Sequence, residues 1–226
     1  GIPPDVIESQ RLENEKAARA AMDQFDEVAR RSTFSAEARM VDASVTSASN
    51  LFASIARRFD LSVIVQPQPD QPVLDRLIVE AALFDSGRPV LIVPYIQRTG
   101  LRLERVLVGW DGSRTAARAV ADAMPLLVRA RATEIVIVDD EAAESDEMPG
   151  ADIVRHLARH GAKAQVNRII SIETDVANAI LSYATDVSAD FLVMGGYGHS
   201  RLREFVLGGA TRGILSSMTI PTLMSH

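Results

Sequence analysis

Residues 104–226 alternate between strand-like and helix-like segments, and this order limits the available folds more than any other feature. The strand patterns are short apolar runs, at 104–110, 133–140, 162–170, 190–196 and 219–226. Helical patterns occupy about 114–130, 149–160, 174–187 and the stretch after Gly208. Strands that alternate with helices form a parallel sheet with right-handed crossovers and helices on both faces. The sequence therefore predicts an α/β fold with an open, mostly parallel, five-stranded Rossmann-like sheet.

The helix expected after residue 113 has a clear start. Ser113 follows Asp111-Gly112 and is well placed as an N-cap. Apolar residues recur downstream at spacings of three and four and predict one buried stripe, made of Ala117, Val120, Ala121, Met124 and Leu127.

The first half of the chain repeats the later part of this pattern. Residues 57–69 parallel residues 186–198, and residues 87–95 parallel residues 218–226, with offsets of about 130 residues. We therefore expect two tandem repeats, at 1–97 and 103–226. The first repeat is incomplete, because the opening strand, helix and second strand that residues 104–140 supply have no counterpart. It should contain a long helix at about 5–30, a strand at 34–41 and a helix at 46–58.

Composition narrows the function. A net charge of −6 argues against nucleic-acid binding, which needs clustered Lys and Arg. No run reaches about 18 apolar residues and no secretory leader pattern is present, so we expect a cytoplasmic protein that does not enter a membrane. The absence of cysteine removes disulfides and thiolate chemistry, and the four histidines form no metal-ligand pattern, so no metal site is predicted.

A glycine cluster near the C-terminus is the main candidate site. Gly195 and Gly198 end a strand, and Gly208 opens a helix ten residues later. A helix N-terminus presents unpaired N–H groups to an anion, and parallel sheets bind ligands at the carboxyl ends of their strands. The cluster is thus either a phosphate cradle or a plain glycine-rich turn. Asp111 is similarly either a ligand contact or only a turn former.

These residues resemble a known family. The spacing Gly195-x2-Gly198-x9-Gly208, together with "VLVGWDGS" at 106–113, is similar to the nucleotide-binding members of the universal stress protein family. The resemblance extends over 104–226 and, more weakly, over the first half, so the whole chain looks like a tandem member with a degenerate first domain. It implies an adenine nucleotide alpha hydrolase-like fold and a role in stress response or signalling.

The resemblance also implies a ligand, which is ATP or a related adenine nucleotide, with or without Mg²⁺. Asp111 would meet its adenosine end, Met194 and Gly195 would line the base or ribose, and Gly198, Gly208 and the residues after them would hold the phosphates. The full set of implied nucleotide-binding residues is Gly109, Asp111, Val138, Met194, Gly195, Gly198, His199, Ser200, Gly208, Gly209, Ala210 and Thr211.

Two departures from the family pattern matter. Gly209 stands where the family's ATP binders carry Ser or Thr, so a hydroxyl is lost that would contribute on the order of 1.5–3 kcal/mol. Thr211 would compensate in part. In the first half, "VQPQPDQP" at 65–72 replaces the glycine motif, so we expect no nucleotide there.

No catalytic set is recognisable, so we do not expect an enzyme, although slow ATP hydrolysis stays open. The alternative function is an interaction or dimerisation module on the same scaffold that binds no nucleotide.

The last strand of each repeat predicts how the molecule assembles. Residues 88–94 and 219–225 are apolar and each contains a proline near its start, Pro89 or Pro221, which suits a sheet edge. A bare apolar edge invites pairing. We therefore expect the two segments to lie together, either as a pseudo-dimer within one chain or between two chains as a homodimer.

Overall fold

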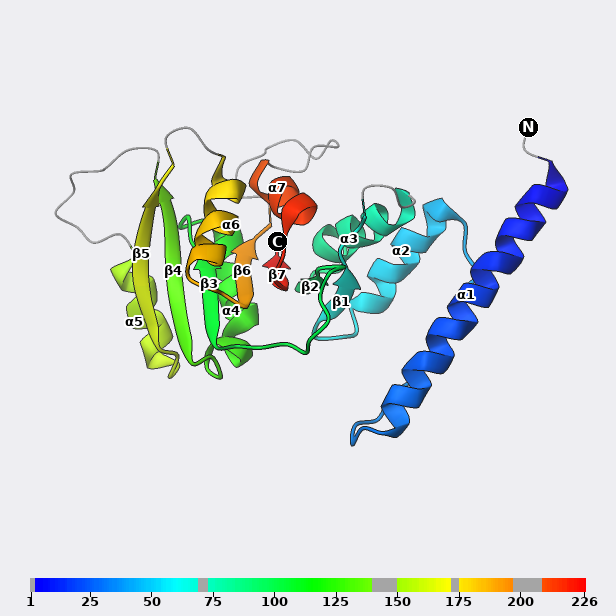
Figure 1. Ribbon diagram of the computed structural model, residues 1–226, viewed down its shortest axis with the longest axis horizontal. Helices are drawn as coiled ribbons and strands as arrows, with labels where there is room; N and C mark the ends of the chain where they lie inside the picture. Colours follow the sequence, from blue (N-terminus) through cyan, green and yellow to red (C-terminus); the bar gives the residue numbers. More distant parts are fainter. Residues whose placement is uncertain (1–2, 69–72, 140–149, 172–174, 197–208) are drawn as a thin grey trace. The chain divides into compact units, whose positions relative to one another are not determined.

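The computed structural model describes residues 3–68, 73–139, 150–171, 175–196 and 209–226, apart from the side chains of Thr46 and Val73 (Figure 1). The chain divides into two compact units, residues 1–44 and residues 45–226. No helix of the described residues is long and apolar enough to cross a membrane.

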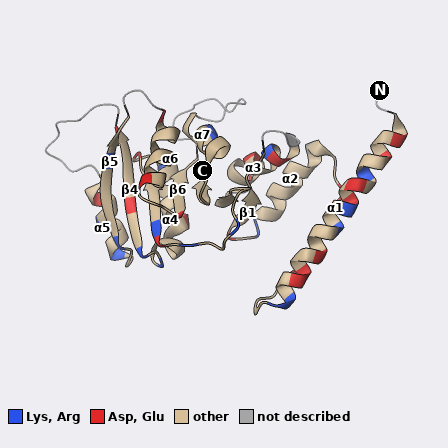
Figure 2. Ribbon diagram, in the orientation of Figure 1, with Lys and Arg blue, Asp and Glu red and all other residues tan. Residues whose placement is uncertain are grey.

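The first unit consists of one long helix and the irregular segment that follows it. Helix α1 (Pro4–Arg30) confirms the long helix predicted at about 5–30, and it begins with proline at its first position, where a missing N–H is tolerated. Ion pairs between neighbouring turns, such as Arg11–Glu8 at 2.8 Å, lie along its charged side, and Figure 2 shows both signs of charge on it. The strand predicted at 34–41 is wrong, because these residues form no regular structure. A strand needs a neighbour to pair with, and this unit offers only a helix.

The second unit is built on one sheet. It has six helices in its described residues, α2 (Val45–Ala56), α3 (Val73–Phe84), α4 (Arg114–Leu127), α5 (Ala151–Arg159), α6 (Val176–Asp186) and α7 (Gly209–Ser217). The strands are β1 (Ser62–Val65), β2 (Val90–Val93), β3 (Arg105–Gly109), β4 (Ala132–Asp139), β5 (Ala164–Ile170), β6 (Phe191–Gly195) and β7 (Thr222–Ser225).

The strand order is β1-β2-β7-β6-β3-β4-β5, and all neighbours are parallel except β2 and β7. The prediction of a mostly parallel α/β sheet is confirmed, but the expectation of a separate five-stranded sheet is corrected. Two strands of the first half continue the five strands of residues 104–226 into a single seven-stranded sheet.

The predicted meeting of the two final strands is confirmed within one chain. Strand β2 runs antiparallel to β7, with Val90 opposite Met224, Leu91 opposite Leu223 and Ile92 opposite Thr222. All six residues are buried. Each strand thereby covers the apolar edge that the other would leave bare.

Helices cover both faces of the sheet, and alternate residues of each strand enter two separate cores. Helices α4 and α5 pack on one face, over residues that include Val108, Ile135 and Val193. Helices α3, α6 and α7 pack on the other face, over residues that include Ile92, Leu107, Val136, Leu192 and Met224.

The predicted N-cap of α4 is confirmed, but its buried stripe is only partly right. Val120 and Leu127 are buried, whereas Ala117 and Ala121 are exposed, and Ala116, Ala119 and Ala123 are buried in their place. This helix carries alanine on several faces, so its apolar periodicity does not select one of them.

The element order helix–strand–helix–strand occurs twice, as α2-β1-α3-β2 and as α6-β6-α7-β7. This agrees with the segments that repeat in the sequence; the boundaries at 97 and 103 stay a prediction. The two copies differ in how deeply the residues of their first strand are buried. Val193 of β6 is fully buried in the core under α4 and α5, whereas Val63 and Val65 of the edge strand β1 are 62% and 60% exposed.

Candidate functional site

The carboxyl end of β3 leads into a tight turn that begins α4. At this turn, Asp111 Oδ1 accepts a hydrogen bond of 2.9 Å from the Ser113 amide, and Gly112 has a positive φ of 71°. Ser113 Oγ then accepts from the Ala116 amide at 3.1 Å and caps the helix. Asp111 therefore has the turn-forming role that the sequence offered as one alternative. It is also exposed at the end of the sheet, where a ligand could reach it.

Gly195, at the carboxyl end of β6, lies against the first turn of α4. A Cβ atom on Gly195 would come within 2.6 Å of both the Ala116 amide nitrogen and the Thr115 carbonyl carbon. Those are backbone atoms, which cannot move aside as a flexible side chain can. Only glycine lets the end of β6 approach the N-terminus of α4 this closely.

The order of strands reverses beside these two ends. From β3 the chain builds outward through β4 and β5, and then returns to place β6 and β7 on the other side of β3. Gly109 and Met194 are opposite each other across the β3–β6 pair. Ligands of open α/β sheets bind outside the carboxyl ends of the strands at such a reversal. The structure therefore brings Gly109, Asp111, Met194 and Gly195 to one place, and Val138 lies at the same edge near the end of β4.

Helix α7 begins at Gly209. Within the described part of the chain, a Cβ atom on Gly209 would meet nothing within 4 Å, so these residues leave room for a larger side chain there. Ala210 is half-buried, and Thr211 is only 2% exposed. The compensation expected from Thr211 stays a prediction. The other implied phosphate contacts, Gly198, His199, Ser200 and Gly208, lie outside the described residues.

An ion pair at the same edge of the sheet was not foreseen. Arg168 of β5 donates to Asp139 at the end of β4, with a distance of 2.7 Å between the Nη2 and Oδ2 atoms. Both side chains are half-buried. The sequence signal was weak, because Asp139 ends an apolar run and begins a row of acidic residues, DDE at 139–141. Within the described ranges, no three His, Asp or Glu side chains are grouped so that they could hold a metal ion.

A polar network lies between the sheet and α6, away from the candidate site. Glu134, the third residue of β4, is 4% exposed and pairs with Arg105, at 3.1 Å between Oε1 and Nη1. The Tyr183 hydroxyl of α6 donates to Glu134 Oε2 at 2.5 Å and accepts from the Asn167 amide. The pKa of Tyr183 is raised, mainly by burial of its hydroxyl and secondly by the neighbouring Glu134 carboxylate. These bonds satisfy a charge that would otherwise destabilise the core.

Replacing Tyr183 by phenylalanine should lower the free energy of unfolding by about 1–3 kcal/mol, because a buried carboxylate loses its hydroxyl donor. The raised pKa means that the folded state favours the protonated phenol. The contribution of Tyr183 to the free energy of unfolding should be complete below the pKa of the unfolded state, about 10. It should be lost as the pH rises through the pKa of Tyr183 in the folded state. Urea denaturation at pH 7 and above pH 10 measures both effects. A variant as stable as the wild type at pH 7 would contradict this role.

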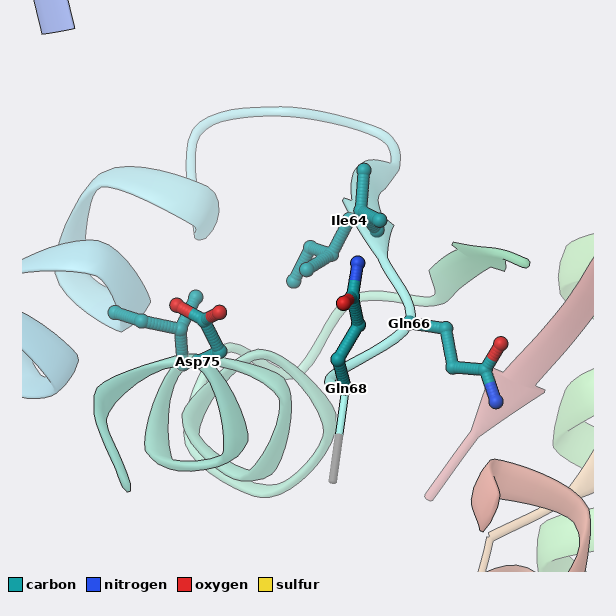
Figure 3. A pocket seen from close by; sticks show the side chains of 6 residues that line it. Ile64, Gln66, Gln68 and Asp75 are labelled. Atoms are coloured by element: carbon teal, nitrogen blue, oxygen red, sulfur yellow. The ribbon is translucent and has the colours of Figure 1, made fainter. Parts of the chain in front are cut away.

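A small cavity lies at the carboxyl end of β1, in the first half. Its volume is 240 Å³, and it is lined by Ile64, Val65, Gln66, Gln68, Asp75 and Ile78. Asp75 places a carboxylate in the first turn of α3, which would repel a phosphate at that helix end. Figure 3 shows the Gln66 side chain directed away from Asp75 and Gln68. The volume is also below the range of about 300–1,000 Å³ that is usual for ligand pockets. The expectation that the first half holds no nucleotide stays a prediction.

Comparison with known proteins decides the family. The sequence profile of the universal stress protein family matches residues 102–226, which is more than half of the chain. This chain belongs to the universal stress protein family. The matched region contains all of β3 to β7 and α4 to α7, and so includes every residue of the candidate site.

A curated member of the family shows the same relation in sequence. The universal stress protein Slr1230 of Synechocystis is 28% identical over 147 residues, which cover 64% of this chain and 49% of that protein. This chain thus spans about half the length of the curated relative that it matches.

Solved structures show the likeness in fold. A universal stress protein from Archaeoglobus fulgidus matches with a TM-score of 0.70 at 18% identity, over 94% of this chain and 79% of that one. A functionally unknown protein from Pseudomonas aeruginosa PAO1 matches with a TM-score of 0.60 at 17% identity, over 92% of this chain and 77% of that one. Both similarities extend well beyond residues 102–226, so the first half of the chain shares in the fold.

Proposed function

We propose that residues 104–226 bind ATP or a related adenine nucleotide, with or without Mg²⁺, and that the protein acts in stress response or signalling as a binding protein and not as an enzyme. Asp111, Gly109 and Val138 would surround the adenosine end together with Met194 and Gly195. The N-terminus of α7 at Gly209 would face the phosphates, together with the glycines and polar residues between 198 and 208.

The observation that carries this proposal is the contact at Gly195. Because this residue has no side chain, the end of β6 and the N-terminus of α4 meet beside the end of β3. This is the strand reversal at which open α/β sheets bind their ligands. Membership of the universal stress protein family supports the same conclusion.

A thermal-shift measurement tests the proposal. A ligand that binds only the folded state stabilises it by about 2.7 kcal/mol at a concentration a hundred times its Kd. For a protein of this size, that is a rise in Tm of about 5–10 °C. We expect such a rise with millimolar ATP and a smaller one or none with CTP. An unchanged Tm with ATP, ADP and AMP would count against the proposal.

The Gly209→Ser variant should bind ATP about ten times more tightly than the wild type. The described residues leave room for the side chain at Gly209, and a hydroxyl at the start of α7 adds a donor to a charged phosphate. Gly209→Ala is the matched control, because it adds the Cβ atom without the hydroxyl. Calorimetric titration of both variants measures the difference. Equal affinities for the serine and alanine variants would place the phosphates away from Gly209.

The alternative is an interaction module that binds no nucleotide. Two observations favour this alternative. Position 209 lacks a hydroxyl, and β2 and β7 pair through buried residues. Under this alternative the Gly209→Ser variant would bind ATP no better than the wild type, and nucleotides would leave the Tm and the assembly state unchanged.

A further inference from the structure

The first half of the chain contacts the second half at the elements that carry the proposed nucleotide site. Three of the described residues of the first half are important in these contacts. They are Gln66, which follows β1, and Leu83 and Phe84 at the end of α3. All of them lie in the compact unit formed by residues 45–226.

The first contact holds helix α7. The Gln66 Nε2 atom donates to the Leu215 carbonyl at 2.9 Å, although the two residues are 149 positions apart in the sequence. Leu215 is among the last four residues of α7, whose carbonyl groups have no partner inside the helix. Gln66 therefore supplies a cap to the helix whose other end, at Gly209, would face the phosphates.

The second contact holds the residue after β6. Gly196 donates its N–H to the Ser225 carbonyl at 2.8 Å and accepts at 3.1 Å from Nδ1 of His226. Leu83 closes the remaining side, since a Cβ atom on Gly196 would lie 2.9 Å from its Cδ2 atom. The His226 ring in turn meets Phe84 edge-on, with ring centroids 5.1 Å apart. Gly196 is thus enclosed by the last residue of the chain and by helix α3.

We infer that the first half of this chain positions the nucleotide site of the second half, through Gln66 on α7 and through Leu83 and Phe84 on the end of β6. This inference rests on the proposed function. It gives the first half a role although that half lacks a glycine motif of its own. Gln66, Leu83, Phe84 and His226 act as positioning residues, because they reach the ligand only through Gly196 and α7.

The test compares the ATP affinity of three variants with that of the wild type, by equilibrium dialysis at a temperature at which all are folded. Gln66→Leu and His226→Ala each remove a hydrogen bond to a positioned element, so each should weaken ATP binding about three- to tenfold. Gln66→Leu also removes the Oε1 atom, which is buried and has no hydrogen-bond partner among the described residues. Its stability should therefore change little while its affinity falls.

Arg57→Ala is the matched control. Arg57 donates two hydrogen bonds to the Asp85 carbonyl and makes them entirely within the first half. It should leave the ATP affinity unchanged even if the Tm falls. If Gln66→Leu and His226→Ala bind ATP as tightly as the wild type and the control, the positioning role is overturned while the proposed function stands. If the wild type itself binds no adenine nucleotide, the proposed function fails, and the inference that rests on it fails as well.

Discussion

The Gly195→Ala variant is expected to melt about 5–10 °C below the wild type. The added Cβ atom would stand 2.6 Å from two backbone atoms at the start of α4, so β6 and α4 must separate. Such overpacking costs about 1–3 kcal/mol and at times more, and each kcal/mol lowers the Tm of a protein of this size by about 2–4 °C. The nucleotide affinity should fall with the stability, because the same contact sets the geometry of the proposed site.

Gly109→Ala provides the matched comparison for stability. Gly109 lies opposite Met194 in the neighbouring strand, but a Cβ atom there would have neighbours no closer than 3.6 Å, which is ordinary contact. Its Tm should stay within about 2–3 °C of the wild type. Differential scanning calorimetry of both variants measures the difference between their Tm values. Equal melting temperatures for the two would show that β6 does not depend on the close approach at Gly195.

The Gly213→Ala variant should show a loss of similar size, for a different reason. Gly213 of α7 faces Ala177 of α6, and a Cβ atom on it would lie 2.5 Å from the Ala177 Cβ atom. The two helices would have to move apart, which we expect to lower the free energy of unfolding by about 2–3 kcal/mol. Denaturation with urea measures this change.

A second substitution should reverse the effect. In the Gly213→Ala, Ala177→Gly double variant, one helix gains an alanine and the other gains a glycine, so the two changes in helix propensity of about 1 kcal/mol nearly cancel. The clash disappears as well, because the Cα atom of residue 177, which remains, is 4.0 Å from the new Cβ atom at position 213. A double variant no more stable than Gly213→Ala alone would show that the helices are not limited by this contact.

The sheet of residues 104–226 could be predicted because its signals are local. Each strand is an apolar run bounded by turn residues, and Ser113 caps α4 where the Asp-Gly-Ser turn predicts. The pairing of 90–92 with 222–224 could also be predicted, because two apolar edges with a nearby proline need cover. By contrast, the strand expected at 34–41 had a suitable pattern but has no partner to pair with.

The site was foreseen less completely than the fold. Spacing led to Gly195, but the reason for glycine there is the contact with Thr115 and Ala116, which lie 80 and 79 positions earlier in the sequence. Contacts of this kind leave no periodic signal. The same holds for Gln66, which looked like part of a degenerate motif and proves to cap α7. Gly198, His199, Ser200 and Gly208 lie outside the described residues, so their roles stay predictions.

Equilibrium dialysis of the purified chain against labelled ATP and Mg²⁺ tests the central claim most directly. The account predicts saturable binding with one nucleotide per chain, because it proposes a single site, at Gly195 and Gly209 in residues 104–226, and expects none in the first half. Adding unlabelled ATP should displace the label, whereas CTP should displace it weakly. Absence of saturable binding at millimolar ATP, or two equivalent nucleotides per chain, would contradict the account.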